Sequence, residues 1–265
     1  MAFSVKKNLA ALYLIKIAKW MNLIMPVIVL FYKSNGLTMK DIFLLQSVYS
    51  LTLMTLEIPT GYFADRTGRK NSILIGASLG FAGYLTYSLS FGFWQFVVAE
   101  IILGVSQSLV SGADSAMLYD TLAGGKQTEK YTKLEGRITS IGNFGEAFAG
   151  IIGGLLAVLS LRTPFYVQTC VALIAIPAAL MLTEPPVQTI KRKFGFSEIR
   201  SILFKSLHGD VKLKWNTFFS AITGAATLTM AWFAQPYFGQ IHLPVSMYGV
   251  LWAALNLSVG VAAIV

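Results

Sequence analysis

Long apolar runs separated by short polar stretches dominate this chain. Eight such runs follow one another, at residues 8–32, 41–64, 72–92, 94–119, 138–160, 163–183, 213–238 and 246–265. Each approaches or exceeds the ~20 residues that an α-helix needs to cross the hydrocarbon of a bilayer. The runs do not alternate apolar with polar residues, and backbone polar groups in lipid must be satisfied within the spanning structure, so helices are predicted rather than barrel strands. We therefore expect an all-α, polytopic helical membrane protein.

The composition supports the bilayer as the solvent of this chain. Hydrophobic residues make up 55% of the sequence and charged residues 12%, whereas soluble domains carry about 25% charged residues. The net charge of +9 would suit a nucleic-acid partner, but the basic residues form short clusters between apolar runs, not one continuous patch. We expect a lipid bilayer as partner and no nucleic acid.

The basic residues lie mostly on one side of the predicted membrane. With the N-terminus in the cytoplasm, that side receives 16 Lys and Arg residues, from Lys6 through the connections around 66–70 and 126–137 to the stretch at 191–214. The other side receives only Lys33, Lys40 and Arg162. The positive-inside rule then places the N-terminus in the cytoplasm, and we expect an integral protein of a bacterial plasma membrane. The first run is longer than the core of a signal peptide, so it is expected to be retained.

The connection after the sixth run is the longest and most basic one. It divides the chain into a six-helix bundle at 1–184, a basic cytoplasmic linker at 185–212 and the start of a second bundle at 213–265, which holds helices seven and eight and is incomplete. Within the linker, Ser197 to Leu207 is expected to form a short amphipathic helix on the membrane surface.

A charge-dense turn separates the second run from the third. It has the pattern Gly61-x-x-x-Asp65-Arg66-x-Gly68-Arg69-Lys70. A glycine at 61 permits close helix approach and one at 68 permits a tight turn. Asp65 can cap the start of the next helix or pair with a cation, and the basic residues can anchor to anionic headgroups.

This pattern, its place between the second and third of six helices and the long central loop resemble the major facilitator superfamily of secondary transporters. The resemblance covers the whole chain, although the family has two six-helix halves and this chain supplies about one and a third. In the family, the matching charged positions latch the two halves in one state. The resemblance implies that Asp65 and Arg69 form such a latch, with Asp120 as a third member. The alternative is a well-capped turn without a gating role.

An internal repeat places the counterpart of this turn outside the sequence. Leu37 and Leu243 each begin the approach to an even-numbered helix, and their positions differ by 206 residues. The same offset carries Asp65 to position 271, just beyond Val265. We therefore expect a fragment or truncated reading of a longer transporter, interrupted in the eighth helix.

Five charged residues lie inside the predicted spans, where charge is costly and indicates function. Lys16, Glu57, Asp114 and Glu146 lie ~9–13 Å from the cytoplasmic ends of their helices at ~1.5 Å per residue, and Lys19 lies somewhat deeper. These groups could meet in one polar cluster. Mutual pairing would simply stabilise the bundle. With two cations against three acids, one carboxylate could instead lack a partner and carry a coupling proton, for which Asp114 and Glu146 are the first candidates.

Polar and aromatic residues on helices one, four and seven are candidates for a substrate cavity, because the family's cavity is lined by those helices. They are Tyr13, Asn22, Glu100, Gln107, Trp232 and Gln235. Glu100 stands where many proton-coupled members of the family have an arginine before a glycine, so that arginine's role does not carry over. An acid there could attract a cationic substrate, pair with a base of the missing half, or simply be hydrated near the interface.

Glycines gather on the fifth predicted helix, at 142, 145, 150, 153 and 154. Small residues at such spacing let helices pack closely, so close packing against a neighbouring helix is expected.

Motifs of enzymes and metal sites do not appear in the sequence. His208 and His242 lack the spacing of metal ligands, and neither a nucleophile motif nor a phosphate-binding loop is present. We expect a secondary transporter without a cofactor, which moves a small organic solute by alternating access, is coupled to protons and exports amphiphilic or cationic compounds. The rival hypothesis is a non-transporting membrane scaffold or an inactive transporter fragment.

Overall fold

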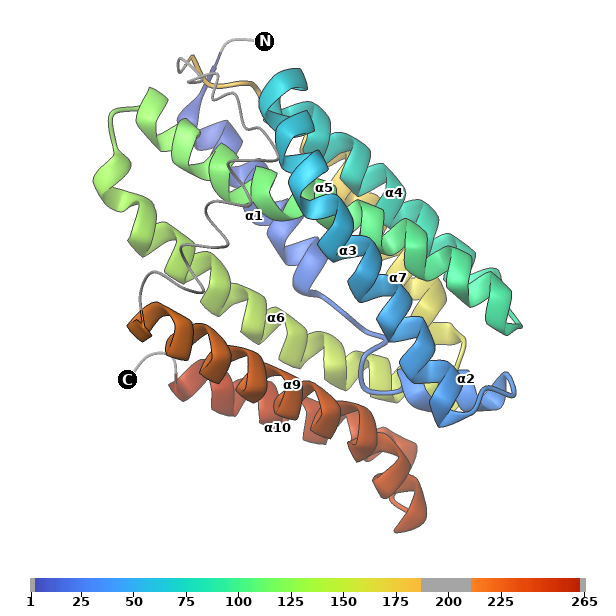
Figure 1. Ribbon diagram of the computed structural model, residues 1–265. Helices are drawn as coiled ribbons and strands as arrows, with labels where there is room; N and C mark the ends of the chain where they lie inside the picture. Colours follow the sequence, from blue (N-terminus) through green and yellow to red (C-terminus); the bar gives the residue numbers. More distant parts are fainter. Residues whose placement is uncertain (1–2, 187–210, 263–265) are drawn as a thin grey trace. The chain divides into compact units, whose positions relative to one another are not determined.

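The computed structural model describes residues 3–186 and 211–262, and every regular element in these ranges is a helix. The expected all-α class is confirmed (Figure 1). Contacts divide the chain into two units, Met1–Gln188 with Leu243–Val265, and Thr189–His242, which are described separately.

The first unit holds α1 to α7 and α10. Their bounds are α1 Val5–Trp20, α2 Ile28–Ser34, α3 Met39–Thr67, α4 Arg69–Leu89, α5 Phe93–Gly124, α6 Tyr131–Leu159, α7 Thr163–Met181 and α10 Val245–Ala262, with a 3₁₀ turn η1 at Thr128–Lys130. The second unit contributes α9, Val211–Gln240. Among the described residues, α3, α4, α5, α7, α9 and the stretch Thr128–Leu159 are long and apolar enough to cross a membrane, so the chain is an integral membrane protein.

The first predicted helix is the main correction to the expected elements. The apolar run at 8–32 is two helices, α1 and α2, because the chain leaves the helical conformation after Trp20 and resumes it at Ile28. Pro26 lies in this break, and a proline inside a helix removes one N–H donor and clashes with the carbonyl four residues earlier. The backbone N–H of Leu23 donates instead to the Gln168 side chain at 2.9 Å. At 16 and 7 residues, neither piece has the length of a full span.

The other boundaries follow the apolar runs closely, with one displacement. The helix expected at 138–160 begins at Tyr131, so Lys133 and Arg137, which were assigned to a connection, lie in its first turns. The helix starts have local causes: Thr38 and Asp41 form a reciprocal capping box at the start of α3, which satisfies two otherwise orphaned backbone donors. The amphipathic helix expected at 197–207 lies outside the described residues.

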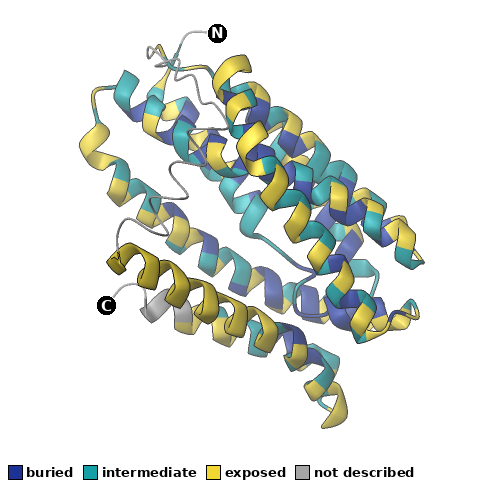
Figure 2. Ribbon diagram, in the orientation of Figure 1, coloured by how far each residue is buried: buried dark blue, intermediate teal, exposed yellow. Residues whose placement is uncertain are grey.

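Helices α3, α4 and α5 pack on one another, α4 and α1 pack on α7, and α6 packs on α10. Small polar side chains join them: the hydroxyls of Thr60, Ser72 and Ser106 donate to backbone carbonyls of neighbouring helices at 2.7–2.9 Å. Outward faces carry large apolar residues, among them Leu51 and Met54 on α3, at 60% and 73% exposure (Figure 2). This pattern of polar contacts inside and apolar side chains outside suits lipid as the surrounding solvent.

Close packing through the glycines of α6 is confirmed. Gly154 lies against Gly249 of α10, and a Cβ atom at Gly142 would come within 2.8 Å of the Trp20 ring of α1. At Gly153, an added Cβ would overlap the backbone carbonyl of Leu23. The break between α1 and α2 therefore rests directly on the backbone of α6.

This contact predicts a large effect of a single methyl group. We expect Gly153→Ala to destabilise the chain by about 1–3 kcal/mol, because the Leu23 backbone must move to make room. Gly136→Ala is the matched control on the same helix, since a Cβ there meets nothing within 4 Å and the substitution should gain up to about 1 kcal/mol of helix propensity. Thermal unfolding of the purified chain in detergent measures both, and a Gly153→Ala midpoint equal to that of the control would contradict the packing.

Candidate functional site

The charged turn lies at the end of the first unit where α1 begins, α3 passes into α4 and α5 ends. We call this the N-terminal end, and the opposite end, where α4 passes into α5, the far end. Gly68 alone separates α3 from α4, and its φ of +100° lies in the region that favours glycine. The predicted tight turn is therefore present. A close approach at Gly61 is not seen, because a Cβ there would have no neighbour within 4 Å.

Three of the predicted latch residues meet beside this turn. The Arg69 guanidinium lies 3.0 Å from an Asp120 oxygen and 3.7 Å from an Asp65 oxygen, which joins α4 to α5 and to the end of α3. The Arg69 and Asp120 side chains are each 17% exposed, and that of Asp65 is 53% exposed. The Arg69–Asp120 contact is thus the better protected of the two, while Arg66 is exposed.

A third acid, which the sequence reasoning missed, caps the start of α4. The Glu184 carboxylate, just after α7, accepts the backbone N–H of Lys70 at 2.7 Å. The Lys70 ammonium donates to the carbonyl of Leu180 at 3.2 Å. The cap expected from Asp65 is therefore supplied by Glu184, which ties the turn to the end of α7. Its signal in the sequence is an acid immediately after a predicted helix, but its partner lies 114 residues away.

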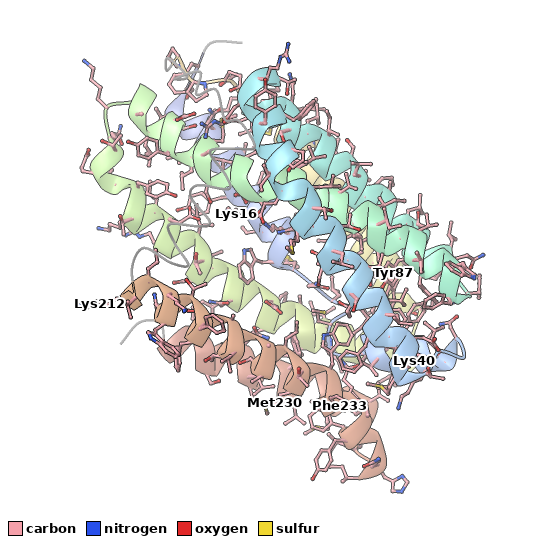
Figure 3. All side chains as sticks on the ribbon, viewed as in Figure 1. Lys16, Lys40, Tyr87, Lys212, Met230 and Phe233 are labelled. Carbon is pink, nitrogen blue, oxygen red and sulfur yellow. The ribbon has the colours of Figure 1, made fainter. Side chains whose placement is uncertain are left out.

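A partly buried ion cluster joins α1, α5 and α6 (Figure 3, where Lys16 is labelled). The Lys16 ammonium lies 3.2 Å from Asp114 and 3.3 Å from Glu135, and Lys19 lies 3.8 Å from Asp114. The Asp114 side chain is 2% exposed. The Ser115 hydroxyl lies within 3.3 Å of both carboxylates. Lys16 therefore stands between two acids on different helices.

The five charges predicted to share one cluster are only partly together. Lys16, Lys19 and Asp114 meet, and Glu135 takes the place expected for Glu57 and Glu146. Glu57 is exposed on α3, and Glu146 lies on α6 beside Trp252 of α10. Glu135 was missed because residues 131–137 read as a polar connection, whereas they begin α6.

The cavity candidates are distributed over several places. Tyr13 packs partly buried against the apolar core of the N-terminal end, and Gln107 is half-buried on α5. Asn22 lies in the break after α1, where its buried side-chain oxygen has no hydrogen-bond partner among the described residues. Trp232 and Gln235 lie on α9, in the second unit.

Glu100 is not at a hydrated interface. It is 4% exposed at the far end of the unit, where one of its oxygens contacts the hydroxyls of Tyr32 and Tyr87 and the amide of Gln46. The alternative of a solvated side chain is therefore wrong.

Comparison with known proteins finds two bacterial resistance proteins and the structure of one transporter. The quinolone resistance protein NorA of Staphylococcus aureus is 24% identical over 240 residues, which are 91% of this chain and 58% of that protein. Multidrug resistance protein 2 of Bacillus subtilis is 24% identical over 163 residues, 62% of this chain and 40% of that protein. The chain thus spans about half the length of the curated relatives it matches.

Among solved structures, the nucleoside transporter NupG has the same fold, with a TM-score of 0.78 at 14% identity over 96% of this chain and 65% of that one. The family described as the Major Facilitator Superfamily matches residues 10–265. This is a family of transporters and not of enzymes. With the match covering nearly the whole sequence, the chain belongs to the Major Facilitator Superfamily.

Proposed function

We propose that this chain belongs to a secondary active transporter that exports a small organic solute by alternating access and couples this movement to protons. The observation that carries the proposal is the ion cluster of Lys16, Asp114 and Glu135, which is held inside a membrane bundle of a transporter family. Ionisable groups in such a place are costly and mark substrate or proton pathways.

The cluster has the geometry of an exchange site. Lys16 is nearly equidistant from Asp114 and Glu135, at 3.2 and 3.3 Å. A proton on Asp114 would cancel its attraction for Lys16 and leave that lysine to Glu135, which loosens α1 from α5 but not from α6. Asp114 is thus our first candidate for the coupling proton. Glu146 is the second, and Lys16 and Lys19 supply the opposing charge.

The latch at the N-terminal end supplies the gate. We propose that this end faces the cytoplasm and that Asp65, Arg69 and Asp120 hold one conformation closed, with Gly61, Arg66, Gly68 and Lys70 shaping the turn. We retain the proposed division into a six-helix bundle at 1–184, a linker at 185–212 and the start of a second bundle at 213–265. Glu184 then connects the gate to the beginning of that linker.

The direction and substrate class are proposed from the relatives. Two of them are named for resistance to quinolones and to multiple drugs, which supports export of amphiphilic or cationic organic compounds. Tyr13, Asn22 and Gln107 are the proposed contacts for such a solute in the first unit, and Trp232 and Gln235 remain separate candidates in the second. Near the start of the break, the Asn22 side-chain oxygen, which has no hydrogen-bond partner among the described residues, can accept a hydrogen bond from it.

Proton coupling is testable by flux measurements. In proteoliposomes that contain the chain, we expect an imposed pH gradient to accelerate ethidium transport, and Asp114→Asn to reduce this acceleration about fivefold or more. Glu129→Gln removes an exposed acid and is the matched control. Asp114→Glu keeps the acid and should restore coupling.

Each outcome of the flux experiment decides something. Full acceleration in Asp114→Asn would exclude Asp114 as the coupling residue. Asp114→Asn removes one of the two carboxylates that face Lys16 and can cost up to about 3–5 kcal/mol. If it does not fold, Lys16→Gln combined with Asp114→Asn removes both charges and serves in its place. No ethidium flux by the wild-type chain would favour the non-transporting scaffold or inactive fragment.

The gate is testable by a double-mutant cycle on Arg69→Ala and Asp120→Ala. Because the two side chains are largely buried and 3.0 Å apart, we expect a coupling energy of about 0.5–3 kcal/mol in thermal unfolding. Arg69→Ala with Glu129→Ala is the control cycle and should show additive effects. Additivity in both cycles would show that the latch contact does not hold the helices together.

A further inference from the structure

Polar side chains from three helices converge on one carboxyl oxygen of a fourth helix at the far end of the first unit. The Oε1 atom of Glu100 on α5 lies 2.9 Å from the Tyr32 hydroxyl of α2 and 2.7 Å from the Tyr87 hydroxyl of α4. The Gln46 amide of α3 donates to the same atom at 3.0 Å. The two tyrosine hydroxyls also contact each other. Figure 3 marks the place of Tyr87.

Aromatic rings seal this site. Tyr32 and Tyr87 are at most 1% exposed, and Glu100 is 4% exposed. Phe96 packs edge-on against Tyr32, and Phe165 stacks on Tyr87. A carboxyl group here has lost nearly all contact with solvent, which makes an uncompensated negative charge costly.

Compensation by a cation is not found in the described part of the chain. The Arg162 guanidinium, at the start of α7, donates to the carbonyls of Ser88 and Ser90 and to the Asn35 side chain, and forms no ion pair with Glu100. The ionisable side chains near Glu100 among the described residues are tyrosines, which are neutral at pH 7: Tyr49 of α3 and Tyr84 of α4, together with Tyr32 and Tyr87. This separates Glu100 from Asp114, which faces two lysines.

Burial without a countercharge decides the state of the carboxyl group. The hydroxyls of Tyr32 and Tyr87 and the amide of Gln46 are neutral partners of Oε1. Hydrogen bonds from neutral groups leave the negative charge of an ionised carboxylate in place, and burying such a charge without an opposite one is costly. A proton on the carboxyl group removes the charge, and a tyrosine hydroxyl can then accept a hydrogen bond from it as well as donate one.

We propose that Glu100 is a proton-binding site, neutral in this conformation, whose hydrogen bonds tie α2 to α3, α4 and α5. On release, the O–H bond of the carboxyl group breaks, the proton passes to water at the far end, and a negative charge is left among neutral side chains. The inference rests on the proposed function only for the use of this proton in transport. Proton binding itself can be measured without transport.

Infrared spectroscopy of the purified chain in lipid nanodiscs tests the site. At neutral pH we expect a carbonyl band of a protonated carboxylic acid that disappears in Glu100→Gln and stays in Glu129→Gln, which removes an exposed acid. Tyr87→Phe should shift this band, because it removes one hydrogen-bond partner while keeping the ring.

The results separate the two proposals. Identical spectra of wild type and Glu100→Gln in the carboxylic acid region would mean that Glu100 is ionised and would overturn the inference. If Glu100→Gln does not fold, the two tyrosine variants decide. A carboxylic acid band that shifts neither in Tyr32→Phe nor in Tyr87→Phe would also overturn the inference. The chain could also show the Glu100 band while a pH gradient has no effect on its ethidium flux. That result would support proton binding at Glu100 and contradict proton-coupled transport.

Discussion

The lipid solvent is the constraint on which the rest of this structure depends, because it offers polar groups no hydrogen bonds. In the first unit, polar atoms form hydrogen bonds with partners on other helices. Asn8 on α1 is fully buried, donates to Thr121 of α5 and exchanges hydrogen bonds with Thr183 after α7. Serine and threonine hydroxyls bond to carbonyls of neighbouring helices in the same way. Because these hydrogen-bond partners lie on different helices, a change in the helix arrangement requires a change in the polar pairing.

Charge is handled differently at the two ends of the unit. At the N-terminal end, acids face cations, as in Arg69 with Asp120 and Lys16 with Asp114. Such contacts join helices when both partners are ionised and weaken when the acid takes up a proton. At the far end, Glu100 faces hydroxyls and an amide, and we propose that the acid there is neutral. Proton uptake therefore weakens the ion pairs at one end and removes an uncompensated buried charge at the other.

Local signals in the sequence were enough for the helices and for the charged turn. Hydropathy outlined the spans, and a glycine between two apolar runs indicated the positive φ of Gly68. Hydropathy runs unbroken across Pro26, however, so the break between α1 and α2 could be found only from the proline itself and from the distant Gln168 that receives the freed N–H. Glu184 and the partners of Glu100 were missed for a related reason: their contacts join residues as far as 114 positions apart.

Because of the break, the ion pair and the tyrosine–acid contact act on separate parts of the first apolar run. α1 carries Lys16 to Asp114, whereas α2 carries Tyr32 to Glu100. A continuous helix would transmit any movement of one contact rigidly to the other. The intervening residues instead are held by Gln168 of α7 and by the backbone of α6 at Gly153. Each half can therefore respond to its own acid while the joint between them stays fixed, which is compatible with the alternating access that we propose.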